Sequence, residues 1–127
     1  MKIINTILFP VFYLYNLILI TFYLYPGSLL GYIFYNDISI EPKITNDFII
    51  SSNHFYVFIV LSILGVFAYQ NTKKIKFLII YLFLLAIILE LIHIVIPVRT
   101  FELRDLFGNI LGVILVIIIY KIKDKYA

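Results

Sequence analysis

The chain has 127 residues, of which 64% are hydrophobic and only 13% are charged, and its mean hydropathy is +1.09. A soluble domain of this length cannot bury so much apolar surface. The composition therefore predicts a single domain embedded in a lipid membrane. The net charge of +3 comes from lysines clustered beside apolar runs, which argues against a nucleic-acid-binding face. The chain has no cysteine, which excludes disulfides and thiolate metal sites.

Four stretches are apolar enough to cross a bilayer, for which about 20 residues are needed. In chain order they span about 3–25, 54–70, 77–96 and 103–121. The first is too long for a signal peptide and has no matching cleavage site. The third ends at Pro97, and Thr100 is the expected N-cap of the fourth. We therefore expect an all-α integral membrane bundle of four transmembrane helices, with residues 1–127 as a single domain.

The connections differ in charge, and this difference predicts the orientation of the chain. The first connection, 26–53, begins with the apolar stretch GSLLGYIFY, expected at the membrane interface, and continues as an exposed loop. Seven lysines are expected on one side of the membrane: Lys2, Lys73, Lys74, Lys76, Lys121, Lys123 and Lys125. Three basic residues are expected on the other side: Lys43, Arg99 and Arg104. The positive-inside rule then places both termini in the cytoplasm, in the inner or plasma membrane of a bacterium.

The stretch ELIHIVIPVRTFELRDLFGN, 90–109, gathers scarce polar residues. Glu90 and His93 lie three apart and share a helix face. Glu90 precedes Pro97 by seven residues, so we expect it about 10 Å below the outer end of the third helix. Asp105 and Asn109 lie four apart on one stripe of the fourth helix.

Gly112 continues that stripe and is expected to let a neighbouring backbone approach closely. His54 opens the second helix on the same side of the membrane. Charged groups in lipid need partners in the bundle interior, so we expect a common polar cluster in the outer leaflet. Its expected core is an ion pair of Glu90 with Arg99 or Arg104, which Asp105 completes.

Each of these residues also has a purely structural interpretation. The Glu90 ion pair closes a helix hairpin, Asp105 favours a helix N-terminus, and Asn109 hydrogen-bonds between helices. His54 and His93 can also be ordinary residues of the membrane–water interface without a role in a site. The Tyr and Phe side chains are interpreted as packing and interfacial groups with no site. His54, Glu90, His93 and Asp105 offer metal-ligand types, but their spacing matches no closed ligand motif and Glu-x-x-His alone is a weak signal. No metal and no cofactor are therefore expected.

Residues 90–112 resemble the signature of VanZ-like membrane proteins. That signature has Glu, a polar residue three on, Pro-x-Arg, Asp, Asn and Gly, matched here by Glu90, His93, Pro97, Arg99, Asp105, Asn109 and Gly112. The stretch NHFYVF, 53–58, is similar to the family's His-Phe motif. Two departures are His93 in place of the usual Gln and the lack of an Asp-Lys pair before His54. The resemblance implies four membrane helices and a link to resistance against teicoplanin-type glycopeptides, without a defined mechanism.

Two functions remain open from the sequence. In the first, the polar cluster binds or processes a lipid-linked or peptidoglycan-related head group. Its candidate catalytic residues are Glu90, Asp105 and His54, and its candidate ligand-binding residues are Arg99, Arg104, Asn109 and His93. In the second, the protein is a non-enzymatic accessory whose cluster is structural and whose loops contact another membrane protein. The expected partners are membrane lipid and such a ligand, with no nucleic acid. A transporter is the weakest interpretation, because the inner helix halves are aliphatic.

Overall fold

The computed structural model describes the backbone of residues 2–127 and the side chains from Thr6 onward, so the side chain of Lys2 lies outside the described residues. Residues 2–127 form five helices and no strand; the helices are α1 (Lys2–Leu24), α2 (Leu29–Tyr35), α3 (Ser52–Tyr69), α4 (Ile75–Ile92) and α5 (Leu103–Tyr126). All but α2 are long and apolar enough to cross a membrane. The prediction of an all-α chain with four such helices is confirmed.

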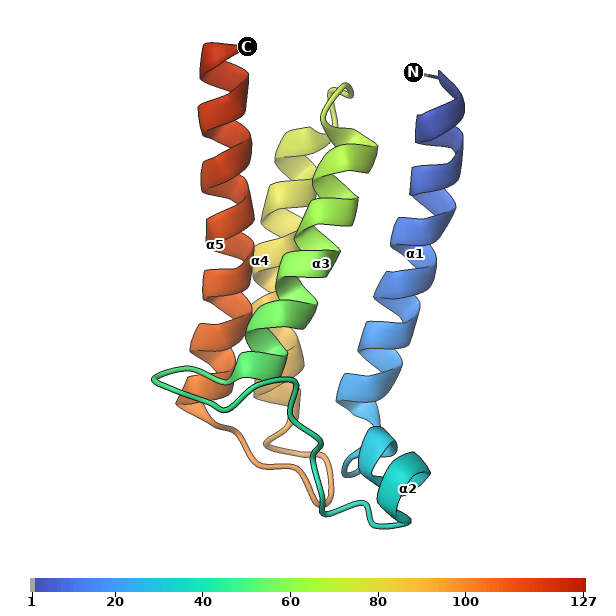
Figure 1. The fold of residues 1–127 in the computed structure, drawn as a ribbon, viewed down its shortest axis with the longest axis vertical. Helices are drawn as coiled ribbons and strands as arrows, with labels where there is room; N and C mark the ends of the chain where they lie inside the picture. Colours follow the sequence, from blue (N-terminus) through green and yellow to red (C-terminus); the bar gives the residue numbers. More distant parts are fainter. Residues whose placement is uncertain (1) are drawn as a thin grey trace.

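The four long helices run side by side, and both termini lie at one end of the bundle (Figure 1). The α3–α4 loop shares that end. The short helix α2, the segment 36–51 and the α4–α5 connection lie at the opposite end, which we call the loop end. The segments that carry Lys43, Arg99 and Arg104, which are the loop 36–51, the α4–α5 connection and the start of α5, lie at the loop end.

The helix boundaries differ from the predicted spans mainly in α4 and α5, and α5 continues to Tyr126 and not only to 121. Helix α4 ends at Ile92 and not at 96, because the residue before a proline avoids the α conformation and residues 93–95 instead make tighter bonds to carbonyls three residues back. Glu90 therefore lies in the last turn of α4, and its expected depth of about 10 Å was wrong. Helix α5 has Glu102 at its N-cap, without a side-chain cap bond, so the expectation for Thr100 was also wrong.

The first connection is partly helical. Ser28 caps α2 by accepting a hydrogen bond of 2.9 Å from the backbone N–H of Gly31, the usual role of serine at a helix start. Helix α2 leaves Tyr32, Ile33 and Phe34 more than half exposed. Such an apolar surface is consistent with the interfacial position expected from the sequence, which stays a prediction.

Helices α3 and α5 form the most extensive interface of the bundle. A Cβ added at Gly112 would lie 2.7 Å from the backbone oxygen of Phe55, and one at Gly108 would lie 2.9 Å from that of Ser51. Both glycines therefore allow backbones to approach more closely than any side chain permits, as small residues do in membrane helices. The expectation for Gly112 is confirmed.

Helix α1 contacts α3 and α4 through polar as well as apolar side chains. The Tyr15 hydroxyl donates to the backbone oxygen of Val57 over 3.0 Å, and Asn16 hydrogen-bonds the hydroxyl of Tyr81. Only 17% of the spanning part of α1 is buried, so this helix is the least enclosed of the four.

Candidate functional site

A buried polar cluster lies where α1, α3, α4 and α5 meet at the loop end. Its members, each from 0% to 7% exposed, are Tyr23, His54, Glu90, His93 and Asn109. Four of the five are residues that the sequence singled out, so the predicted convergence of separate helices is found. Tyr23 was interpreted as packing only, and that interpretation was wrong because its hydroxyl bonds within the cluster.

Asn109 organises the centre of this cluster. Its Nδ2 group donates to the backbone oxygen of Ala86 over 3.1 Å, so its Oδ1 must face the opposite way and accept. The Tyr23 hydroxyl donates to this Oδ1 over 2.6 Å, and Nδ1 of His54 lies 3.1 Å from it. An amide oxygen only accepts, so this geometry assigns the proton of a neutral His54 ring to Nδ1.

The Glu90 carboxylate is fully buried and only half satisfied. Its Oε1 accepts a bond of 3.1 Å from the backbone N–H of Glu102, which ties α4 to the start of α5. Its Oε2 has no hydrogen-bond partner, although His93 Nδ1 lies 3.3 Å away and His54 Nδ1 lies 3.7 Å away. A buried oxygen without a partner carries a large desolvation cost, so Oε2 is the least satisfied atom of the cluster.

The two arginines do not pair with Glu90, contrary to expectation. Arg99 donates from Nη2 to the backbone oxygen of Phe22 over 2.9 Å and from Nε to that of Tyr25 over 3.2 Å. It thereby caps the last carbonyls of α1, which have no partner within the helix. Arg104 is 53% exposed and lies near Asp47 and Glu102 on the surface. Of the predicted site residues, Arg104 alone is thus outside the shared site.

Two carboxylates approach the outer face of His54. The Asp105 carboxylate lies 3.5 Å from His54 Nε2, and that of Glu41 lies 4.0 Å from the same atom. One ligand atom each of His54, Glu90 and Asp105 can be chosen so that all three lie within 4.8 Å of one another. The sequence did not indicate Glu41 as a site residue. It lies in an exposed loop, where no helical spacing relates it to another polar residue.

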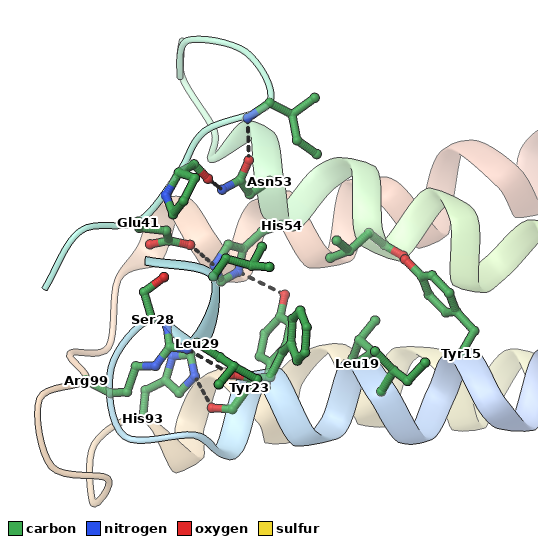
Figure 2. A pocket seen from close by; sticks show the side chains of 16 residues that line it. Tyr15, Leu19, Tyr23, Ser28, Leu29, Glu41, Asn53, His54, His93 and Arg99 are labelled. Carbon is green, nitrogen blue, oxygen red and sulfur yellow. Dashed lines mark hydrogen bonds and ion pairs between the residues drawn. The ribbon is translucent and has the colours of Figure 1, made fainter. Parts of the chain in front are cut away.

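A cavity of about 310 Å³ opens beside the cluster, between α1, α3 and the loop end. Its walls along the helices are apolar and include Leu19, Phe22 and Val57. Its loop end is polar, and Figure 2 shows His54, His93, Arg99 and Glu41 gathered there around the same space. The cavity therefore has one apolar arm and one polar end.

Comparisons of the chain with family models, with curated proteins and with solved structures give no match.

Proposed function

We propose that the protein is a VanZ-like membrane protein of the bacterial envelope that binds an amphiphile by its polar head group. The single observation that supports this most is the cavity of about 310 Å³ with an apolar arm and a polar end. Its volume is in the range of small-ligand pockets. We place the loop end on the outer side of the membrane, because the lysine clusters at the other end favour the cytoplasm.

The apolar arm suits a hydrocarbon chain. Leu19 and Phe22 of α1 face Val57 of α3 across it, and α1 is the least enclosed helix. A lipid tail that enters between these two helices exchanges contacts with other lipids for contacts with protein. The polar end then receives the head group at the depth where lipid head groups lie.

The polar end suits an anion with a neighbouring hydroxyl or amine. Arg99 uses one Nε and one Nη2 donor on α1 carbonyls, which leaves further guanidinium N–H groups for a phosphate or carboxylate. Glu41 lines the same end with its side chain 48% exposed and accepts from a hydroxyl or ammonium. A lipid-linked, peptidoglycan-related head group carries both kinds of group.

Native mass spectrometry of the purified protein tests this proposal, with a polyprenyl phosphate as ligand and the corresponding polyprenol as the control without phosphate. Val57→Phe fills the apolar arm, whereas Val60→Phe makes the same change on the same helix at a position that is 42% exposed and outside the cavity. We expect wild type and Val60→Phe to retain polyprenyl phosphate and Val57→Phe to bind it roughly tenfold more weakly, about 1.4 kcal/mol. Equal binding by the two variants would refute the proposal.

The same pair of variants extends the test to cells. Expression of wild type and Val60→Phe in a susceptible host is expected to lower teicoplanin susceptibility, and Val57→Phe is expected not to. Activity and abundance are measured together, so that a loss of function is not mistaken for a loss of protein.

Two contacts favour the accessory function as the second candidate. Arg99 caps α1 and Glu90 holds the backbone of Glu102, so both charged groups already have structural partners. If the cluster only stabilises the fold, alanine at Glu90, Arg99 or Asp105 lowers abundance in proportion to any loss of function. If the cluster binds a ligand, some of these variants keep normal abundance and lose function.

A further inference from the structure

We infer that His54, Glu90 and Asp105 form a binding site for one divalent transition-metal ion of the Zn²⁺ or Mn²⁺ class. The three residues belong to α3, α4 and α5, and one ligand atom from each lies within 4.8 Å of the other two. The sequence predicted no metal, because the spacing of His54, Glu90, His93 and Asp105 matches no closed ligand motif. The tertiary fold brings them together.

The protonation pattern of the rings supports a cation at this point. Asn109 Oδ1 takes the Nδ1 proton of His54, so a neutral ring presents the Nε2 lone pair to Asp105, 3.5 Å away. A lone pair that faces a carboxylate is repulsive unless a positive charge lies between them. A metal-bound histidine typically has this arrangement, in which the other ring nitrogen donates to a fixed oxygen.

The buried Glu90 is an independent second observation. His93 Nε2 lies 3.0 Å from the backbone oxygen of Tyr23, and a carbonyl only accepts, so Nε2 carries the proton. In a neutral His93 the Nδ1 atom then presents a lone pair to Glu90 Oε2, which has no hydrogen-bond partner. This oxygen, on a side chain that is 0% exposed, is the unsatisfied group that a cation would bind.

No arginine or lysine whose side chain the structure describes forms an ion pair with these carboxylates. Arg99 is bonded to the end of α1, and Arg104 lies on the surface beside Asp47 and Glu102. Within the described chain, Glu90 and Asp105 have only histidines as ion-pair partners. Uncompensated carboxylates are costly in a membrane protein, and a divalent ion offsets both.

The distances and ligand types indicate the class of ion. Two ligands about 2.0–2.2 Å from a tetrahedral Zn²⁺ lie roughly 3.4 Å apart, close to the 3.5 Å between His54 Nε2 and Asp105. One imidazole with two carboxylates suits Zn²⁺ or Mn²⁺ better than Mg²⁺. Glu41 is 4.0 Å from the same nitrogen and provides a fourth ligand, unless water or the head group takes that position. The inference stands without the proposed lipid ligand, because it uses only contacts within the chain.

Isothermal titration calorimetry on the full-length protein tests this inference. The protein is freed of metal with a chelator and titrated with Zn²⁺, Mn²⁺ and Mg²⁺ separately, without lipid ligand. We expect one equivalent of Zn²⁺ or Mn²⁺, a rise in Tm on binding and weaker binding of Mg²⁺. Asp105→Asn and His54→Gln should bind more than about tenfold more weakly, since even losing a group behind a ligand costs that much. Glu102→Gln, which changes a neighbouring exposed carboxylate outside the site, should bind like wild type.

Three results would overturn the metal site. One is the absence of saturable metal binding by wild type. A bound proton would then be the positive charge that offsets the buried carboxylates. Another is equal affinity in Asp105→Asn and Glu102→Gln, which would indicate adventitious ions. If the ligand variants do not fold, Co²⁺ titration of wild type decides, because a four- or five-coordinate site gives intense visible absorption. Observing only the spectrum of hydrated Co²⁺ would be the third contrary result. Loss of polyprenyl phosphate binding with normal metal binding would count against the proposed function alone.

Discussion

Helix α3 packs against α5 and against α1 in two different ways. Against α5 it meets glycines, and the two backbones approach so closely that a Cβ at Gly112 would lie 2.7 Å from the oxygen of Phe55. Against α1 it meets large side chains, the contact at Tyr15 is a hydrogen bond to the Val57 carbonyl, and a cavity of about 310 Å³ remains.

The two interfaces of α3 have different roles. The close α3–α5 interface fixes His54 relative to Asn109 and Asp105, so that a polar cluster forms with defined partners. The looser α1–α3 interface leaves room for a ligand beside that cluster. Rigid positioning and access are thus supplied by opposite faces of the same helix.

Breaking the close interface should have the largest effect. Gly112→Val forces a side chain against the backbone of α3, and we expect a loss of about 3 kcal/mol in the free energy of unfolding, measured by SDS titration in mixed micelles. Gly65→Val is the control, because a Cβ there would meet the side-chain ends of Phe12 and Leu78 at 3.0–3.2 Å and not backbone. An equal loss for the two variants would mean that the close approach is unimportant.

Removing one hydroxyl compares two contacts of α1, one inside the polar cluster and one along the α1–α3 interface. Tyr23→Phe leaves Asn109 and His54 without the phenol between them, and should cost about 2 kcal/mol because buried polar atoms lose a partner. Tyr15→Phe removes a bond to a carbonyl on the α1–α3 side and should cost roughly 0.5–1 kcal/mol. The same unfolding titration ranks them, and the reverse order would contradict the idea that α1 is held mainly at the polar cluster and more loosely along α3.

The loop that covers the cavity should respond to pH. The hydrogen bond from Lys43, with one from the backbone of Ser52, holds the pKa of Asp47 below its usual range. A lowered pKa in the folded state gives stability that is complete above the unfolded pKa and is lost as the pH falls through the folded pKa.

Asp47→Asn should therefore cost about 1 kcal/mol at pH 7 and pH 5. The difference from wild type should shrink below about pH 4, as followed by thermal unfolding at each pH. Asp37→Asn is the comparison, because hydrogen bonds from Ser39 also lower the pKa of Asp37 but tie it only to a residue two positions on. It should show the same trend with a smaller cost. A difference that grew on acidification would have the wrong sign.

The smallest effect is expected at the turn that presents Arg99. Val98 has a φ of +65°, a left-handed conformation that costs a β-branched residue roughly 1–2 kcal/mol. Val98→Gly removes this strain but adds chain entropy of about 0.5–1 kcal/mol, so we expect a gain below about 1 kcal/mol in thermal unfolding. A clear loss of stability would show that the Val98 side chain, 62% exposed, has a role in packing.

The sequence predicted some features of the site well and others poorly. Spacing along one helix placed Asn109 and Gly112 on a shared stripe, and this proved correct because helical geometry is local. Pairing across helices was less predictable, since the assumed partner of Glu90 was an arginine and its neighbours are His54 and His93. The open carbonyls at the end of α1 bind Arg99 instead, and no periodicity in the sequence reveals that competition.

By itself the sequence determined that the chain is helical and apolar enough for four membrane crossings, because length and hydropathy depend only on residue order. It also determined that the scarce polar groups gather at one end. The tertiary structure decided which groups meet: Tyr23 with Asn109, Glu41 with His54, and three metal-ligand types from three helices. These contacts depend on how closely each pair of helices packs, and that follows from side-chain shapes on separate segments.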